Sequence, residues 1–570
     1  LMLTRNNNIS KMVNINLENS QMTIGKNARI HSFTDNNDYD DKSQLYGVNV
    51  FKTSEQADEK ADINIGENAA IVVTGNNMGK IGGLKNSIAG TAALGDYSTI
   101  TVAQTSSEIY NPEDITADNI QQGSGQYIAG YMGNQAEKTT FNNHISIHVW
   151  GNTDTANASA YGSDNAYGDL ETKDNLSVTV NTTGYTNSYG LSTVGQDDAH
   201  RGNTVTGNNL TVNVTGDKTA YGIYNGYQKN GYSQTIVGNH SQLTVKGDTA
   251  AGISSSGSEG TVIMGDKAKV ETEGSRAAFG ILNQYGANTT FKGAAEITSH
   301  MGSDLGYAAY SMDEGSLIDI RGEGQKQITG NLMSRNDGTI LLTMDTGDSF
   351  LTGKSDTKVP SDSRVGTTNI DMSNGALWNM TDSSTVTNLT NNSGATVDMT
   401  YNKNGTHTLT VGNFSGNDGI FLMQSDLASQ EEGDKVNITS AAAGSSGLIS
   451  VYDRSFVTGN RVMGVKHLLM VKDASKNATF SGKSLDTGGL WEITPTIQRG
   501  GTFTDADGKV VGKPNEWYLV TMAKKPNKDT TPVIDIGDNT YGLYRLSIDT
   551  LRQRGTCGIG TGVTTSTTSG

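Results

Sequence analysis

One phrase is written several times in the middle of this chain. A short run in which apolar and polar residues alternate is followed by a segment of small residues that ends in glycine. The glycines of successive copies lie at intervals of 32, 30, 28 and 26 residues, at Gly190, Gly222, Gly252, Gly280 and Gly306. Self-similarity at a period of about 20 to 50 residues is typical of solenoids, in which each repeat packs on its neighbours.

The alternating runs predict strands. In residues 210–214, Leu210, Val212 and Val214 fall on one face, and Thr211 and Asn213 fall on the other. Strands of four to six residues are expected, joined by clusters of Gly, Asn, Asp and Ser that accept left-handed backbone angles. A repeat of this length is too short for a propeller blade, which needs about 40 residues. The sequence therefore predicts an all-β chain, folded as a right-handed parallel β-helix.

Composition agrees with a long ordered solenoid. Of 570 residues, 18% are charged, 70 are glycine and only 6 are proline, whereas a disordered chain carries more charge and proline. The net charge is −17, with lysine and arginine dispersed, so nucleic acid is not expected as a partner. The single cysteine, Cys557, excludes a disulfide framework.

Aromatic residues and loops are the variable parts of the repeat. Tyr221, Phe279 and Tyr307 lie next to the repeat glycines, and stacked ladders are the favoured interpretation, with a binding surface as the alternative. Protruding loops are expected at four places, where recognition would be found if it exists. These loops are residues 35–45, 104–126, 152–174 and 195–202.

The C-terminal third contains a different succession of motifs. Asn374 to Met380 leads to Ser384 to Leu389 and Gly394 to Met399, followed by Thr408 to Met423 and Gly444 to Val451. Residues 370–453 in this order resemble the pertactin-type autochaperone region of monomeric (type V) bacterial autotransporters. The segment Tyr541 to Arg554 is similar to the short helix that enters the translocator barrel of these proteins, and the barrel itself is absent from this sequence.

The resemblance implies a domain organisation and a location. Residues 1–370 would form a β-helix passenger with protruding loops, and residues 371–530 a C-terminal β-helix cap that folds first. Residues 531–554 would be a linker and the start of a helix, and residues 555–570 a non-native or disordered tail. The passenger would be exported across the outer membrane to the cell surface of a Gram-negative bacterium, with membrane contact only through the absent barrel. Residues 1–8 contain no apolar core of a signal peptide.

Large aromatic residues of the cap have an expected role. Trp378, Phe414, Phe421, Trp491 and Trp517 would bury the apolar area that makes this end of the β-helix stable. A stable end would template the coils above it, because a parallel strand needs a neighbouring coil to pair with.

A search for chemistry finds no strong motif. The string from Gly347 to Phe350 lacks the second glycine of a serine-protease Gly-Asp-Ser-Gly, and chance recurrence is favoured. His144 and His148 on one strand would stand about 13 Å apart, too far for one metal ion. A cluster of Asp35, Asp38, Asp40 and Asp41 lacks calcium-loop spacing, so a hydrated loop is favoured. No catalytic, cofactor-binding or metal-binding residue is therefore predicted.

The sequence thus favours an adhesin of the autotransporter class and not an enzyme. Its partners would be glycans or proteins of host or bacterial surfaces, or other copies of itself in aggregates and biofilm. Two alternatives stay open. The chain could be a β-helix polysaccharide lyase or hydrolase, since fold does not fix function, or a structural stalk for a missing N-terminal domain.

Overall fold

The computed structural model describes residues 11–53, 60–226, 232–402, 405–428, 432–457, 466–486 and 491–526. The chain divides into two compact units. The first comprises residues up to 422 together with 434–447 and 471–479, and the second comprises 423–433, 448–470 and the residues from 480 onwards. The predicted helix at 541–554, the tail at 555–570 and Cys557 lie outside the described residues.

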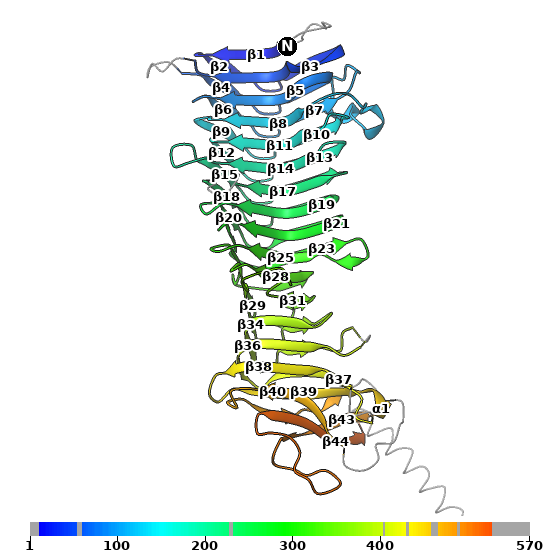
Figure 1. Ribbon diagram of the computed structural model, residues 1–570. Coiled ribbons are helices and arrows are strands. Elements are labelled where there is room, and N and C mark those ends of the chain that lie inside the picture. Colours follow the sequence, from blue (N-terminus) through cyan, green and yellow to red (C-terminus); the bar gives the residue numbers. More distant parts are fainter. Residues whose placement is uncertain are drawn as a thin grey trace, which may run out of the picture. The chain divides into compact units, whose positions relative to one another are not determined.

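The first unit is a parallel β-helix, as the repeat predicts. Each coil adds strands to two long sheets, and the coils stack in chain order (Figure 1). One coil consists of β10 (Ser146–Asn152), β11 (Ser159–Ala166) and β12 (Asp169–Thr172). Ser146 pairs in parallel with Ser177 in the next coil, and Ser177 pairs with Thr211 in the one after. This register brings equivalent residues of successive copies one above another.

The strands of the first sheet supply two positions in each coil, and those of the second sheet supply one. The first sheet of this unit contains β1 (Lys11–Glu18), β3 (Arg29–Phe51), β5 (Ala70–Ser87), β7 (Thr99–Gln104), β8 (Tyr127–Asn134), β10, β11, β13 (Ser177–Thr183), β14 (Asn187–Val194), β16 (Thr211–Gly216), β17 (Thr219–Asn225), β19 (Gln242–Ser256), β21 (Ala268–Gln284), β23 (Ala295–Met301), β24 (Asp304–Leu305), β25 (Tyr307–Met312), β27 (Lys326–Thr329), β28 (Asn331–Arg335), β30 (Phe350–Thr352), β31 (Ser355–Asp356), β33 (Leu377–Asn379) and β35 (Thr396–Asp398).

The second sheet of the unit contains β2 (Gln21–Ile24), β4 (Asp62–Ile65), β6 (Thr91–Leu94), β9 (Lys138–Phe141), β12, β15 (Gly202–Thr206), β18 (Ser233–Val237), β20 (Thr261–Met264), β22 (Asn288–Phe291), β26 (Leu317–Ile320), β29 (Thr339–Met344), β32 (Thr367–Met372), β34 (Ser384–Asn392), β36 (Thr408–Asn417) and β38 (Lys435–Ala441). All of these strands pair in parallel with the coils before and after them where both partners are described.

The interior is filled by the alternating residues. Val212 and Val214 of β16 are buried, and Thr211 and Asn213, which alternate with them, are partly exposed, as predicted. The repeat glycines allow the first sheet to approach the core closely. A Cβ on Gly252 would lie 2.2 Å from Cγ1 of Val270 and 2.7 Å from the carbonyl oxygen of Gly280. Glycine is therefore required there by space and not by backbone angle.

A column of turns closes each coil before the first sheet. Its residues adopt left-handed backbone angles, with φ of 58° at Tyr97, 59° at His144 and 64° at Asn175. The residue before the left-handed position can cap the neighbouring coil. Before Asn175, for example, the Asp174 carboxylate accepts a hydrogen bond from the backbone amide of Asn208 at 2.7 Å. Side chains of Asx type thus satisfy backbone groups that the turns leave free.

Three sequence predictions about local structure are wrong. Residues 35–45 are not a loop, because β3 continues through them and pairs with β5 with register shifts between Asp35 and Gln44. Residues 152–174 are not one loop, because they contain β11 and β12. Strands also exceed six residues, since β19 and β21 stay paired around the corner of the coil. The loops predicted at 104–126 and 195–202 are confirmed except at Gln104 and Gly202, which belong to β7 and β15.

The domain boundary at 370/371 stays a prediction, and residue 370 lies within the first unit. Strand β32 runs across residue 370 and pairs with β29 on one side and β34 on the other. The second unit contains α1 (Arg454–Val457) and an antiparallel arrangement of β42 (Leu485–Asp486), β43 (Trp491–Arg499) and β44 (Glu516–Pro526). The strands β37 (Gly419–Ser425), β39 (Ser446–Asp453), β40 (Leu468–Asp473) and β41 (Thr479–Gly482) each contribute residues to both units.

Most of the large aromatic residues predicted to be buried are buried. Trp378, Phe414 and Phe421 lie in the core of the first unit, and the indole N–H of Trp378 donates to the carbonyl of Gly353 at 3.0 Å. Trp517 of the second unit is only partly buried, and its ring packs edge-on against Phe480. The side chain of Trp491 lies outside the described residues.

Candidate binding surface

The outward residues of the first strand position of the first sheet form one continuous surface, here called the outer face. Parallel register aligns them in columns along the coils. One column contains His148, Thr179, Asn213, Thr244, Glu271 and Thr298, and another contains Trp150, Asn181, Thr215, Lys246, Glu273 and His300. The outer face is therefore aromatic at β10, uncharged and polar over β13 and β16, and charged from β19 to β23.

The excursion at residues 105–126 folds back onto the outer face. It contains two short 3-10 helices, η1 (Pro112–Asp114) and η2 (Ala117–Asn119). Its ends are close together, because the amide of Gln121 donates to the carbonyl of Gln104 at 3.2 Å. Side chains hold the two helices together, since Asn119 donates to the carbonyl of Asp114 at 2.7 Å.

A small apolar core lies beneath the excursion, outside the β-helix. Ile109 and Ile115 are buried against Val72 and Ala103 of the outer face, and Ile120 and Trp150 pack beside them. His31 is also buried here, with its ring 4.5 Å from that of Tyr110. Burial of apolar area on both sides stabilises the docked position of the excursion.

A hollow of about 570 Å³, here called the covered hollow, lies between the excursion and the outer face. One wall is the sheet and the adjoining turns, and the other is the segment 111–115. Its volume lies within the range of about 300 to 1,000 Å³ that is usual for small-ligand sites. The lining consists of Arg29, Asn68, Ala69, Ala70, Tyr97, Thr99, Asn111, Pro112, Glu113, Ile115, Ser146, His148 and Trp150.

Aromatic and hydroxyl groups meet in this lining. The ring of Tyr97 lies on the ring of His144, with centroids 4.6 Å apart and planes 5° apart, yet Tyr97 is 61% exposed. Thr99 and Ser146 are paired neighbours in β7 and β10. Burial lowers the pKa of His148, so its imidazole is neutral at neutral pH and offers one donor and one acceptor nitrogen.

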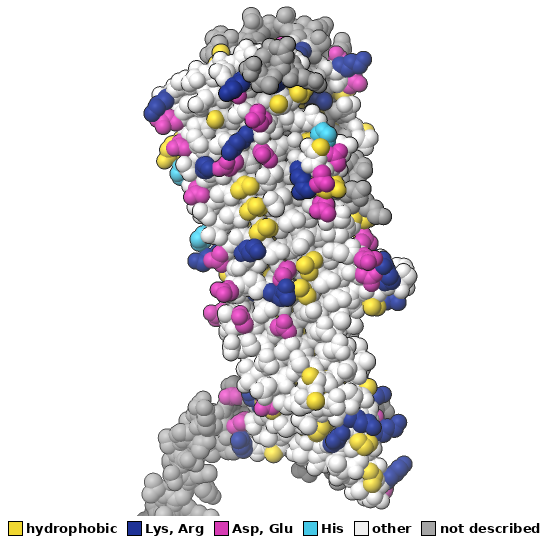
Figure 2. All heavy atoms as spheres, turned by 90° about the vertical axis from the view of Figure 1, so that its left-hand side faces the viewer, with side chains coloured by type: hydrophobic (Ala, Val, Ile, Leu, Met, Phe, Trp, Pro, Cys, Tyr) yellow, Lys and Arg dark blue, Asp and Glu magenta, His cyan; other side chains and the backbone are white. Residues whose placement is uncertain are grey.

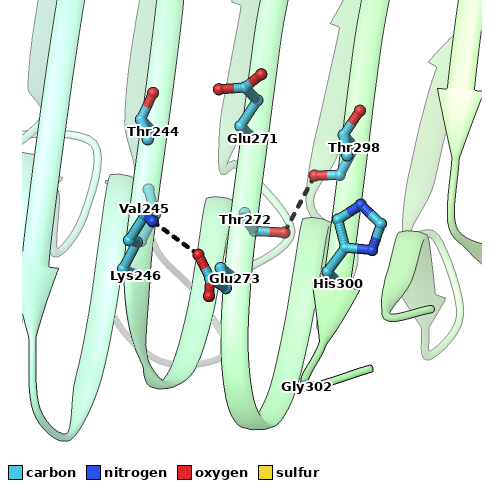
Figure 3. A pocket seen from close by; sticks show the side chains of 9 residues that line it. All are labelled: Thr244, Val245, Lys246, Glu271, Thr272, Glu273, Thr298, His300 and Gly302. Atoms are coloured by element: carbon cyan, nitrogen blue, oxygen red, sulfur yellow. Dashed lines mark hydrogen bonds and ion pairs between the residues drawn. The ribbon is translucent and has the colours of Figure 1, made fainter. Parts of the chain in front are cut away.

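A second hollow of about 430 Å³, here called the open hollow, lies further along the outer face. Figure 3 shows its residues on three neighbouring strands, with Lys246 linked to Glu273 and His300 beyond them. Nζ of Lys246 lies 2.7 Å from Oε2 of Glu273, and the hydrogen bond from Lys246 lowers the pKa of Glu273. Glu271 is paired with Lys269 at 2.8 Å. The carboxylates of this hollow are thus engaged with lysines.

The predicted aromatic ladder is confirmed at the second strand position. Tyr161, Tyr189 and Tyr221 stack in sequence, with centroids 4.6 and 5.0 Å apart and planes within 11° of parallel. Phe279 and Tyr307 form a second stretch at 5.8 Å. Because the ring faces lie on one another along the axis, the ladder offers mainly ring edges to solvent.

The serine, histidine and aspartate residues that the sequence did not favour as catalytic or metal-binding sites have other structural contacts. Ser349 is buried, and its hydroxyl accepts from the amide of Lys326 and bonds Thr346. The expectation that His144 and His148 share one strand is wrong, because His144 lies in the turn before β10. The Asp40 carboxylate accepts from the amide of Lys42 at 3.0 Å. Among the described residues, no three His, Cys, Asp or Glu side chains are grouped to hold a metal ion.

Sequence reasoning placed recognition in the loops but did not find the covered hollow. Its aromatic residues, Tyr97 and Trp150, come from the coils, where the alternating pattern gives no reason to single them out. The available signal was the set of Ile109, Ile115 and Ile120 inside an otherwise polar excursion. Three aliphatic residues in a surface loop indicate that the loop packs on something.

Charge on the visible face of the β-helix is mixed. In Figure 2, acidic and basic side chains are interspersed among uncharged polar groups along the stack of coils, and hydrophobic side chains follow one another in a column. No helix within the described ranges has the length and apolar character needed to cross a membrane.

Comparisons with known proteins give a likeness in fold alone. No family model matches the chain, and no curated protein matches its sequence. The crystal structure of the autotransporter UpaB from E. coli strain CFT073 is 14% identical, with 91% of this chain and 95% of that chain covered, and a TM-score of 0.30. The Haemophilus influenzae Hap adhesin is 13% identical over 86% of this chain and 63% of that chain, with a TM-score of 0.29.

Proposed function

We propose that this chain is the passenger of an autotransporter, exposed on the surface of a Gram-negative bacterium, and that it acts as an adhesin. The resemblance of residues 370–453 to an autochaperone region supports export. The parallel β-helix of the first unit supports the same assignment. Its regular coils present columns of polar side chains and the excursion at 105–126 on the outside. Attachment to host or bacterial surfaces, with aggregation and biofilm formation, is the activity proposed.

One observation carries the proposal of binding. The excursion at 105–126 buries Ile109 and Ile115 and walls a hollow of about 570 Å³. An ordered excursion that borders a hollow next to aromatic and hydroxyl groups supports recognition better than a plain stalk does. The partners proposed are therefore surface glycans or proteins that reach this hollow, and no nucleic acid.

The open hollow contains two carboxylates, Glu271 and Glu273, and is one place where the rival enzyme hypothesis can be examined. A glycosidase needs one carboxylic acid that stays protonated, with a raised pKa, beside an ionised carboxylate. Glu273 has the opposite shift, because Lys246 lowers its pKa. Glu271 is bound to Lys269. This pairing argues against glycoside hydrolysis at this hollow. The test is incubation with a glycan panel, in which new reducing ends or unsaturated products would support the enzyme.

The adhesin hypothesis is tested by display on a non-adherent bacterium. The chain is joined to an autotransporter barrel, and residues 106–119 are replaced by two glycines, which the 3.2 Å contact between Gln104 and Gln121 allows. We expect attachment and clumping with the intact chain and loss of attachment after this excision. The matched control shortens the turn at 196–201, where the amide of Gln196 donates to His200 at 2.9 Å. Equal attachment of the intact chain and of bacteria without it would refute adhesion.

A further inference from the structure

The covered hollow has a chemistry that narrows its ligand. We propose that it binds one neutral saccharide ring, a hexose or an N-acetylhexosamine, between Tyr97 and the segment 111–115. The inference deepens the proposed function, on which it rests, by naming the class of ligand that the adhesin holds at this place.

An aromatic ring is available for the apolar face of a sugar. One face of the Tyr97 ring is covered by His144, at 4.6 Å and 5°. Tyr97 lines the hollow and is 61% exposed, so the part of its ring that His144 does not cover is accessible to a ligand. The indole of Trp150 is a second aromatic group of the lining, and it is partly buried. Flat apolar surface of this kind packs against the C–H groups of a pyranose.

Hydrogen-bonding groups suit hydroxyls, which both donate and accept. The hydroxyls of Thr99 and Ser146 belong to paired residues of neighbouring coils. The side-chain amide of Asn68 donates to Oδ1 of Asn27 at 2.6 Å and that of Asn111 to the Asp114 carboxylate at 3.1 Å, so what each can offer a ligand is its second N–H and its carbonyl oxygen. His148 is neutral at neutral pH, because burial lowers its pKa, and therefore also donates at one nitrogen and accepts at the other. A lining with both capacities matches a ring of hydroxyl groups.

Charge argues against an anionic glycan. Among the lining residues, Arg29 is the one permanent cation and Glu113 is the carboxylate. Sulfate and carboxylate groups are usually bound by several lysine ammonium or arginine guanidinium groups. A guanidinium N–H of Arg29 already donates to the carbonyl of Asn68 at 2.9 Å. The lining is thus balanced in charge, and a neutral ring is favoured over a sulfated or carboxylated one.

The test titrates the full chain with methyl glycosides of glucose and galactose, with N-acetylglucosamine and with sialic acid, followed by saturation-transfer NMR. We expect signals from at least one neutral sugar and none from sialic acid. Tyr97→Asn should weaken binding at least tenfold. Asparagine keeps the turn, because Asn68 and Asn175 occupy left-handed turn positions, with φ of 56° and 64°.

A matched control is available elsewhere in the chain. Tyr285 is also an exposed tyrosine in a left-handed turn, with φ of 55° against 58° for Tyr97, and it does not line the hollow. Tyr285→Asn should bind the sugar as the parent does. Thermal unfolding of both variants checks that neither has lost its fold.

Three results would overturn the inference: no neutral sugar binds at millimolar concentration, sialic acid alone binds, or Tyr97→Asn binds as well as Tyr285→Asn. The failure of this inference is distinguishable from that of the proposed function. If no sugar binds but excision of 106–119 still abolishes attachment, the saccharide is wrong and the adhesin stands. If the sugar binds at Tyr97 and attachment is absent, the saccharide site stands and the adhesin hypothesis is wrong.

Discussion

The phenol hydroxyl of Tyr127 donates a hydrogen bond of 2.6 Å to the carboxylate of Asp164 on the neighbouring coil. The hydroxyl of Ser192 also reaches this carboxylate, at 3.2 Å. Burial nevertheless dominates and raises the pKa of Asp164 to about 6. A buried carboxyl group with this pKa makes the first sheet more stable in mild acid than at neutral pH.

Asp164→Asn should raise the melting temperature at neutral pH and flatten its pH dependence. Between the ordinary pKa of 3.8 and about 6, the folded state binds the proton of Asp164 more tightly than the unfolded state does. Stability from this group therefore falls as the pH rises through that window, and it is greatest below it. Thermal unfolding of parent and variant across about pH 4 to 7 measures the difference. A parent and variant with parallel pH profiles would contradict the raised pKa.

The excursion at 105–126 should loosen in mild acid. Burial lowers the pKa of His31 from 6.5, against an opposing effect of Glu108. The docked state thus prefers neutral His31, so docking weakens as the pH falls below 6.5 and is unaffected above it. Hydrogen exchange of residues 105–126 should be faster at about pH 5.5 than at pH 7.5 after correction for intrinsic rates.

His31→Phe keeps a ring against Tyr110 and removes the titration, so its exchange in this segment should lose the acid sensitivity. His240→Asn, in a turn where the preceding coil carries Asn209, is the control that should keep it. Acid sensitivity that survives in His31→Phe would assign the effect to another group.

The stacking of coils could be predicted because its causes are local. A single repeat shows the alternation of Leu210, Val212 and Val214, and a comparison of the repeats shows the recurring glycine. Strand β11 was missed because its buried positions are Ala160, Gly162, Ser163 and Asn165, which do not read as an apolar face. The covered hollow could not be predicted, since it joins Tyr97, Trp150 and the segment 111–115 through packing between distant parts of the sequence.

Gly252→Ala should destabilise the first unit by about 1 to 3 kcal/mol, the usual effect of overpacking. Its new methyl group would meet Val270 at 2.2 Å and the Gly280 carbonyl at 2.7 Å. Gly25→Ala is the matched change, because a Cβ there meets nothing within 4 Å. Urea unfolding measures both variants, and equal midpoints would show that the corner has room to relax.

Trp378→Phe should lower stability by about 1 to 3 kcal/mol, because it leaves the buried carbonyl of Gly353 without its donor. Tyr401→Phe, at a residue 52% exposed, should stay within about 0.5 kcal/mol of the parent. The comparison uses urea denaturation followed by circular dichroism. A Trp378→Phe variant as stable as Tyr401→Phe would mean that solvent reaches the Gly353 carbonyl.

Parallel register gives the first unit a mechanical property. From Ser146 to Ser177 and on to Thr211, one coil takes up 31 and then 34 residues. The backbone hydrogen bonds that join coils point along the axis, so tension applied at one end loads a single rung at a time instead of shearing whole sheets. Each rung that peels away would release roughly 100 Å of extended chain, so the first unit would lengthen under tension in steps, one coil at a time.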